Sequence, residues 1–318
     1  MLARVVRSGL EESVHLGHVA VCDASGRVVA SAGNPARIVF ARSSLKPLQA
    51  AVSMAMWGDP LDDADVAIMC GSHNGEPVHV DAVRRLLRRT ILEESALRCP
   101  PAWPWHVEDA HMYEAPRSIL HNCSGKHAGM LIASFGNGWD VENYLDPEHP
   151  LQQRIREWGG PVMGVAEPAI GVDGCGAPVF AVPLHAMATL FARLVTADGP
   201  DLISAGMRRA VEAMRAEPYL VAGRNRIDTA LMQQIDTLVV KSGAEGLVCA
   251  GIIERGLGVA VRIDDGSARA TGPALIRALH LLEVVGSEQV EALEGLARPP
   301  VLGGSRAVGA LTSTFSFD

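Results

Sequence analysis

The chain has 318 residues, a net charge of −8 and a pI near 5.8, with 48% of its residues hydrophobic and 20% charged. This length suffices for a large core, and the acidic balance argues against the clustered basic face that nucleic-acid binding needs. Aromatic residues make up 4% of the chain, which also argues against base-stacking platforms.

The start of the chain and its hydropathy predict a cytoplasmic protein without membrane partners. Arg4 and Arg7 are followed by Glu11, Glu12 and His15 rather than by an apolar run, so no secretion signal is expected. No stretch reaches the roughly 18 apolar residues that a membrane span needs. The six scattered cysteines are therefore expected to be reduced, buried or ligating rather than joined in a disulfide framework.

Strands are predicted first, at residues 19–22, 28–31 and 37–40, with a turn at residues 23–26. From Ser44, apolar residues recur at three- and four-residue steps, which predicts a helix that ends near Gly58. Further helices are predicted at residues 80–92, 127–135, 150–158, 183–195, 202–214 and 227–235. The densest basic run, Arg84, Arg85, Arg88 and Arg89, has helical spacing and is interpreted as a solvated helix face.

Strands return at residues 237–241, 247–254 and 257–263, the last two meeting at a hairpin turn at Arg255-Gly256, and a helix at 273–285 follows. This order predicts an α/β (α+β) fold with one antiparallel sheet, built from both ends of the chain and flanked by helices. A helical region from about 44 to 236 is inserted between the strands. We therefore expect residues 1–318 to form a single catalytic unit.

Ser43 and Lys46 form the first candidate for chemistry. A strand delivers Ser43 to the start of a helix, where Lys46, three residues on, shares its face. A serine hydroxyl becomes a good nucleophile when a base removes its proton, and a lysine of lowered pKa can be that base. Alone, the pair is a weak signal and is more typical of an N-capping serine beside a surface lysine.

Two further segments extend this pair into an ordered signature. Ser72-His73-Asn74 lies on a Gly-rich loop, and Lys241-Ser242-Gly243 ends an apolar strand. Each alone could be a plain turn or strand end. Together, Ser-x-x-Lys, Ser-x-Asn and Lys-Ser-Gly stand in the chain order typical of penicillin-binding proteins and serine β-lactamases.

Two cysteine segments could hold a metal. Cys123 and Lys126 lie in the run 121–127, ahead of an apolar helix, and Cys175 lies in the turn 171–178. Two thiols and nearby basic nitrogens suit a soft metal such as zinc, but the spacing differs from that of standard zinc sites. From the residues alone, buried or catalytic cysteines remain the alternative.

The five segments together resemble the L-asparaginase II family, the thermolabile class 3 type. The motifs that carry the resemblance are Arg42-Ser43 through Gln49, Cys70 through His79, His121 through His127, Val172 through Pro178, and Lys241 through Gly246. They span residues 42–246. The resemblance implies a fold similar to serine β-lactamases and glutaminases, and hydrolysis of L-asparagine to L-aspartate and ammonia.

The resemblance also implies roles for residues. Ser43 would be the nucleophile and Lys46 its base, with Ser72 and Lys241 as a second Ser–Lys pair. Cys123, Lys126 and Cys175 would hold zinc. Asp173 would bind the substrate's α-ammonium group, with Arg42, Asn74 and His127 completing the pocket. A homodimer is expected, and glutaminase or a β-lactamase-like acyl hydrolase are the alternative enzymes.

Overall fold

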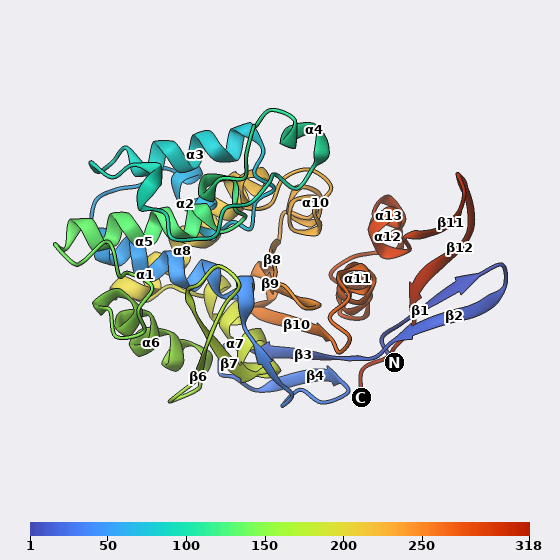
Figure 1. Cartoon of the computed structure of the whole chain (residues 1–318). Helices are drawn as coiled ribbons and strands as arrows, with labels where there is room; N and C mark the ends of the chain where they lie inside the picture. Colours follow the sequence, from blue (N-terminus) through green and yellow to red (C-terminus); the bar gives the residue numbers. More distant parts are fainter. The chain divides into compact units, whose positions relative to one another are not determined.

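The computed structural model describes all 318 residues, and its contacts divide the chain into two compact units (Figure 1). Unit 1 comprises Met1–Ser44, Val182–Arg193 and Val240–Asp318, and unit 2 comprises Leu45–Ala181 and Leu194–Val239. Both ends of the chain therefore build one unit and the long middle builds the other. That the whole chain acts as a single catalytic unit stays a prediction.

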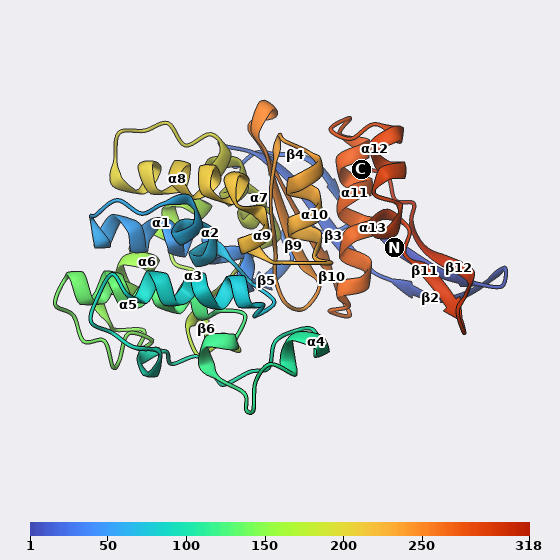
Figure 2. The same cartoon turned by 90° about the horizontal axis from the view of Figure 1, so that it is seen from above.

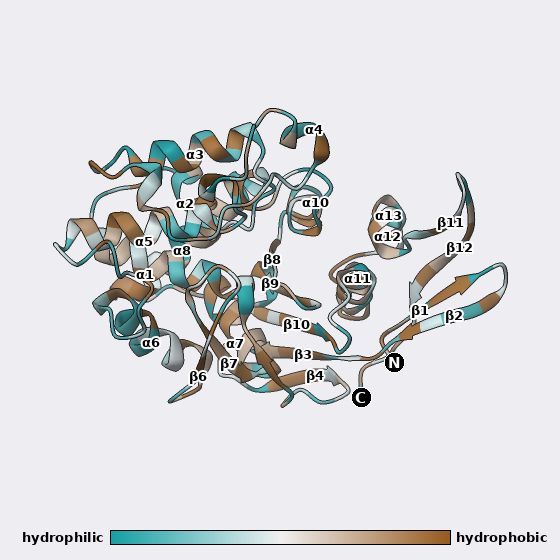
Figure 3. Ribbon diagram, viewed as in Figure 1, coloured by the Kyte–Doolittle hydropathy of each residue, from teal (hydrophilic) through white to brown (hydrophobic).

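The main sheet of unit 1 has the strand order β4-β3-β10-β9-β8. Its strands are β3 (Gly17–Asp23), β4 (Val28–Ala32), β8 (Leu238–Ser242), β9 (Leu247–Ile252) and β10 (Leu257–Ile263). The central strands are rich in valine and alanine and almost wholly buried, and they are brown in the hydropathy colouring of Figure 3. Continuous apolar runs of this kind indicate a strand covered on both faces.

Two helices of unit 1 pack on this sheet, namely α7 (Leu184–Val195) and α11 (Thr271–Leu281). Helix α7 approaches β10 at Gly258, where a Cβ atom would lie 1.9 Å from the carbonyl oxygen of Ala188. Helix α11 contacts β10 and β9. The short strand β5 (Ile38–Phe40) leads to the end of the first segment of unit 1.

A second antiparallel sheet, β11-β12-β1-β2, also belongs to unit 1. It consists of β1 (Ala3–Arg7), β2 (Leu10–His15), β11 (Pro300–Gly303) and β12 (Arg306–Ser313), and helices α12 (Ser287–Ala292) and α13 (Glu294–Ala297) precede β11. The expectation of a single sheet was therefore wrong. Strand β1 lies at the start of the chain and its partner β12 near the end, and a local sequence pattern cannot predict pairing between such distant segments.

Unit 2 is mainly helical, as predicted for the middle of the chain. Its helices are α1 (Lys46–Trp57), α2 (Asp63–Cys70), α3 (Pro77–Leu87), α4 (Val107–Ala110), α5 (Ser124–Gly136), α6 (Pro150–Met163), α8 (Leu202–Ala216), α9 (Pro218–Val221) and α10 (Ile227–Gln234). Strands β6 (Ala169–Val172) and β7 (Pro178–Pro183) pair antiparallel. Helix α1 packs against α2, α5, α6 and α8, so the helix that begins at Lys46 is the centre of unit 2 (Figure 2).

The α/β class with antiparallel sheets and many helices is confirmed. Helix α2 was missed because its apolar run is short, and α3 ends at Leu87, earlier than the predicted residue 92. No helix combines the length and apolar character that crossing a membrane requires.

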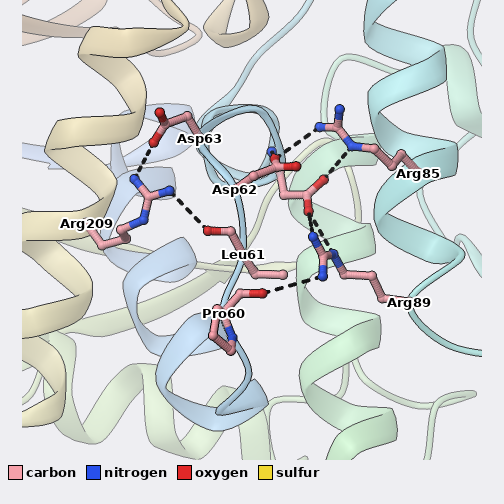
Figure 4. A network of polar contacts seen from close by, with 8 residues as sticks. Pro60, Leu61, Asp62, Asp63, Arg85, Arg89 and Arg209 are labelled. Atoms are coloured by element: carbon pink, nitrogen blue, oxygen red, sulfur yellow. Dashed lines mark hydrogen bonds and ion pairs between the residues drawn. The ribbon is translucent and has the colours of Figure 1, made fainter.

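All four arginines of the basic run are at least partly exposed, as the interpretation of a solvated face requires, but two of them also pair with a buried carboxylate. Asp65, at the start of α2, is fully buried and accepts hydrogen bonds from Arg85 Nε at 2.9 Å and Arg89 Nε at 2.7 Å. Figure 4 shows Arg85 and Arg89 pointing toward the segment that carries Asp62 and Asp63. Arg84, by contrast, reaches Asp81 only at 3.7 Å, and that carboxylate is exposed. Because a buried carboxylate needs partners, Asp65 on α2 binds two arginines that helical spacing alone predicts to contact only solvent.

Candidate active site

The turn that carries Ser43 is strained. Arg42 has φ 46°, in the left-handed region that non-glycine residues rarely adopt, and residues Arg42–Leu45 form a 3₁₀ turn ahead of α1. Ser43 is 8% exposed. Positive φ at a bulky residue costs free energy and tends to mark functional turns, so this geometry singles out the serine that follows.

Unit 1 brings this turn to the end of β8. Ser44 Oγ donates a hydrogen bond to the carbonyl oxygen of Lys241 at 3.0 Å. A Cβ atom on Gly243 would lie 3.1 Å from Ser44 Oγ and 3.4 Å from Arg42 Cβ. A side chain at this position would therefore crowd the turn that carries Ser43. Lys241 is fully buried, and its Nζ donates to the carbonyl oxygen of Ser242 at 2.8 Å. The first and third signature segments therefore meet within one unit.

Unit 2 brings Lys46 together with Ser72. The buried Nζ of Lys46 donates to Ser72 Oγ at 2.9 Å, to the carbonyl oxygen of Asn122 at 3.2 Å and to the carbonyl oxygen of Gly71. Three segments far apart in the sequence therefore converge on one amine. Loss of a proton from Nζ would still leave two N–H groups for the two carbonyls, and would turn a lone pair toward Ser72.

His73 holds the loop that carries Ser72. Its Nδ1 accepts from the backbone N–H of Gly75 at 3.1 Å, so Nε2 carries the proton and donates to Ser124 Oγ at 3.0 Å. Ser124 Oγ in turn donates to the carbonyl oxygen of Ile119 at 2.8 Å. Burial, followed by the charges of His79 and Lys46, lowers the pKa of His73 well below 6.5. The ring is a neutral structural link in this position.

Cys123, Lys126 and Cys175 form a buried cluster in unit 2. Lys126 Nζ donates to Cys175 Sγ at 3.0 Å. A hydrogen bond from Cys175 is the main cause that lowers the pKa of the Cys123 thiol well below 9.0, and the same contact raises the pKa of Cys175. Burial alone would lower the pKa of Lys126, but the charges of Cys175 and Cys123 outweigh it and raise that pKa above 10.5.

This donor set suits a soft metal. Two sulfurs and one amine converge there, and the thiolate character of Cys123 is the form that binds zinc. No group of three or more His, Cys, Asp or Glu residues capable of holding a metal is present, so a site here depends on the lysine as third ligand.

His127, which follows Lys126 in the sequence, has a buried ring nitrogen without a hydrogen-bond partner. The ring is fully buried, and its Nδ1 lies 2.6 Å from Tyr144 Oη, which accepts from the backbone N–H of Arg98. His127 Nε2 has no hydrogen-bond partner. Burial lowers the pKa of His127 well below 6.5. Tyr144 was missed by the sequence analysis because nothing in its surroundings marks it.

The structure gives two other predicted binding residues protein partners. Asn74 is buried, donates to Glu76 Oε1 at 2.9 Å and accepts from Arg226 at 2.9 Å. Asp173, half-buried in the turn between β6 and β7, accepts from the backbone N–H of Gly174 at 2.9 Å. Asn74 therefore belongs to a buried polar network that positions the loop.

Comparison with known proteins gives a family match over nearly the whole chain. The L-asparaginase II family matches residues 3–313. No curated protein matches the chain. Among solved structures, Mglu in its tris and glutamate form shares 16% identity with a TM-score of 0.50, over 89% of this chain and 63% of Mglu. This chain therefore spans less than two thirds of the length of Mglu in that structure.

Two other solved structures are more distant in shape. A β-lactamase from Mycobacterium bovis shares 17% identity with a TM-score of 0.43, covering 84% of this chain and 94% of its own. A probable glutaminase from Bacillus subtilis, complexed with 6-diazo-5-oxo-L-norleucine, shares 11% identity with a TM-score of 0.40, covering 89% and 90%.

Proposed function

The chain belongs to the L-asparaginase II family, and from that premise we propose that it hydrolyses L-asparagine to L-aspartate and ammonia with a serine–lysine nucleophile. Family membership supports amidohydrolase activity. The observation that carries the finer proposal is the buried amine of Lys46, bonded to Ser72 Oγ within the family's own motifs.

Ser43 is the proposed nucleophile and Lys46 its base. Ser43 Oγ attacks the side-chain carboxamide carbon, and backbone N–H groups at the start of α1 hold the oxyanion. The C–N bond then breaks, and the departing nitrogen takes a proton to leave as ammonia. Water hydrolyses the aspartyl ester and restores the serine hydroxyl.

The hydrogen bonds of Lys46 support a proton relay through Ser72. Two carbonyl acceptors fix two N–H groups of Nζ, so the third position faces Ser72 Oγ at 2.9 Å. Because the free position of Nζ faces Ser72, a proton from Ser43 would reach Lys46 through Ser72 Oγ and return through the same contact to the leaving nitrogen. Lys241 is proposed as the partner of Ser72 that completes the relay.

Substrate recognition is proposed to fall to four residues. Asp173 would bind the α-ammonium group through its half-exposed carboxylate, and Arg42 the α-carboxylate. The unpartnered Nε2 of His127 supports a contact with a bound group. Asn74 would act through the loop it holds, because its amide is engaged by Glu76 and Arg226.

We further propose that Cys123, Lys126 and Cys175 hold a zinc ion. The ion would supply a fixed positive charge that orients the substrate, since Ser43 supplies the nucleophile. Both thiols and the amine must be deprotonated for binding, so zinc affinity should fall at low pH. The thiolate character of Cys123 supports this assignment.

Ammonia release from L-asparagine and L-glutamine, measured side by side, tests the reaction. Ser43→Ala should abolish turnover and Lys46→Ala should lower it by roughly 10²–10⁴-fold. Ser53→Ala is the matched control, because Ser53 is buried on the same helix and donates only to the carbonyl oxygen of Gln49. Normal asparagine turnover in both site variants would refute the assignment, and faster glutamine turnover would make the enzyme a glutaminase.

Metal content of the purified protein tests the zinc site. Cys175→Ser should lose the zinc that the unsubstituted chain retains. Cys99→Ser should keep it, because Cys99 is equally buried but bonds the carbonyl oxygen of Ser118. Equal zinc in both variants would exclude Cys175 as a ligand.

A cytoplasmic location and a homodimer complete the proposal. All six cysteines are free, which suits a reducing compartment. Light scattering should give about twice the chain mass of 33.7 kDa. A mass equal to one chain would overturn the dimer.

A further inference from the structure

A pocket in unit 1 lies apart from every residue of the proposed mechanism. Its volume is about 410 Å³, within the range of small-molecule sites. It is lined by α11, α12, α13 and the residue that follows α13, together with strands β1 and β12. Figure 2 shows these elements together near the chain termini.

The lining concentrates positive charge in an acidic protein. Arg4, Arg277 and Arg298 all line the pocket, while no lining residue is acidic. The whole chain carries a net charge of −8, so this composition runs against the average. Guanidinium groups are the side chains best suited to bind carboxylate and phosphate in a forked geometry.

These arginines lack internal counter-ions. Arginines elsewhere, such as Arg117 and Arg209, form ion pairs with carboxylates. Arg4 and Arg298 form no ion pair, and the only side-chain bond of Arg277 runs from Nε to the carbonyl oxygen of Phe315 at 3.0 Å. No carboxylate of the chain therefore pairs with any of these three guanidinium groups.

Polar and apolar groups complete the walls. Thr312 pairs directly with Arg4 across the sheet, so its hydroxyl lies on the same face as that guanidinium. His280 Nδ1 donates to the carbonyl oxygen of Val285 at 3.0 Å, which leaves Nε2 for the pocket. Ile276 and Val290 supply apolar contact.

We propose that this pocket binds a small molecule bearing at least two anionic groups, carboxylate or phosphate, on a compact body. One anionic group pairs with Arg4 beside Thr312, and a second with Arg298. Arg277, anchored by its Nε, presents its remaining N–H groups between them. The site is independent of the amide hydrolysis proposed above.

Calorimetric titration of the full chain with citrate and, separately, with pyrophosphate tests the proposal. At least one should bind saturably with a Kd below about 1 mM, and the better ligand distinguishes a carboxylate site from a phosphate site. Arg298→Ala and Arg4→Ala should each weaken that binding about tenfold, the loss typical of one charged hydrogen bond.

Arg7→Ala is the matched control. Arg7 lies on the same strand as Arg4 but pairs with Glu12 outside the pocket, so its loss should leave binding unchanged. Arg298 is exposed, and asparagine turnover without added anion should be the same in Arg298→Ala as in the unsubstituted chain. Absence of saturable binding by both probes would overturn the proposal, as would equal weakening in Arg7→Ala.

Discussion

Removal of the Asp65 carboxylate should strongly destabilise unit 2. Asp65 is fully buried, and its two oxygens accept three hydrogen bonds from Arg85 and Arg89. Breaking a buried ion pair costs about 3–5 kcal/mol because it leaves a charge without its partner. Both arginines are partly exposed and can turn toward water, so Asp65→Asn should cost about 3 kcal/mol, the lower end of that range.

The arginines should show coupled losses. Arg85→Ala or Arg89→Ala alone leaves Asp65 one partner, and each should cost about 1.5–3 kcal/mol. The double variant leaves the carboxylate buried and unpaired, so its loss should exceed the sum of the two. Urea unfolding, read as the shift in midpoint at constant slope, measures all three.

Arg84→Ala is the control for this series. Arg84 lies on the same helix as Arg85, but its contacts are long, at 3.7 Å to the exposed Asp81 and 3.9 Å to the partly exposed Glu94. Such a pair contributes at most about 1 kcal/mol. If Asp65→Asn costs no more than Arg84→Ala, the reasoning from burial is refuted.

Two further predictions concern the surroundings of the proposed site. Burial holds the pKa of His73 below its unfolded value of 6.5, so its contribution to stability is complete above pH 6.5 and falls by about 1.4 kcal/mol per pH unit below it. In His73→Gln, the free energy of unfolding in urea should therefore depend less steeply on pH between about pH 7 and pH 5, by the uptake of one proton. An unchanged pH dependence would contradict this. A Cβ atom on Gly125 would lie 2.2 Å from the Ile68 carbonyl oxygen, so Gly125→Ala should cost about 1–3 kcal/mol by overpacking. The three atoms nearest to a Cβ on Gly129 all belong to the flexible Met69 side chain, so Gly129→Ala should cost less. Thermal unfolding that ranks the two variants the other way would count against the close contact of Gly125 with Ile68.

The Asp65 cluster also bears on the proposed chemistry. Helix α2 ends at Cys70 and α3 begins at Pro77, so the loop that carries Ser72 is bounded by the two helices that Asp65 joins. The bonds of Asp65 with Arg85 and Arg89 hold the two helices together and so limit the positions that the loop can take. Loss of these bonds should therefore reduce turnover as well as stability.

Local sequence patterns predicted most elements because helix and strand periodicities are properties of neighbouring residues. Helices α1, α5 and α8 and strands β3 and β10 lie where apolar spacing put them. The sheet β11-β12-β1-β2 was not predicted because its strands come from the two ends of the chain. The ion pairs of Asp65 were not predicted for a related reason. Its arginine partners lie in another segment, and the spacing of charged residues does not show that Asp65 is buried.

The sequence motifs named the residues of the candidate site, whose roles stay predictions, but did not give their contacts. The motifs named Lys46, Ser72, Lys126 and Cys175, and the structure joins them as two hydrogen-bonded pairs. The amide of Asn74 was expected to face substrate, yet protein groups engage it. A side chain's partners depend on packing between distant segments, which a motif does not record.

The choice of lysine over arginine is the most informative feature of the charge distribution. Among 28 lysine and arginine residues, only Lys46, Lys126 and Lys241 are lysines, and each is at most 4% exposed. Surface positive charge in this chain is therefore carried by arginine alone. Arginine cannot lose its proton in a protein, whereas a buried lysine amine can. Lysine thus stands only at buried positions of the proposed site, as a base at Lys46, a metal ligand at Lys126 and a relay partner at Lys241. Because the neighbouring thiols raise the pKa of Lys126, a metal would have to displace a proton from its amine.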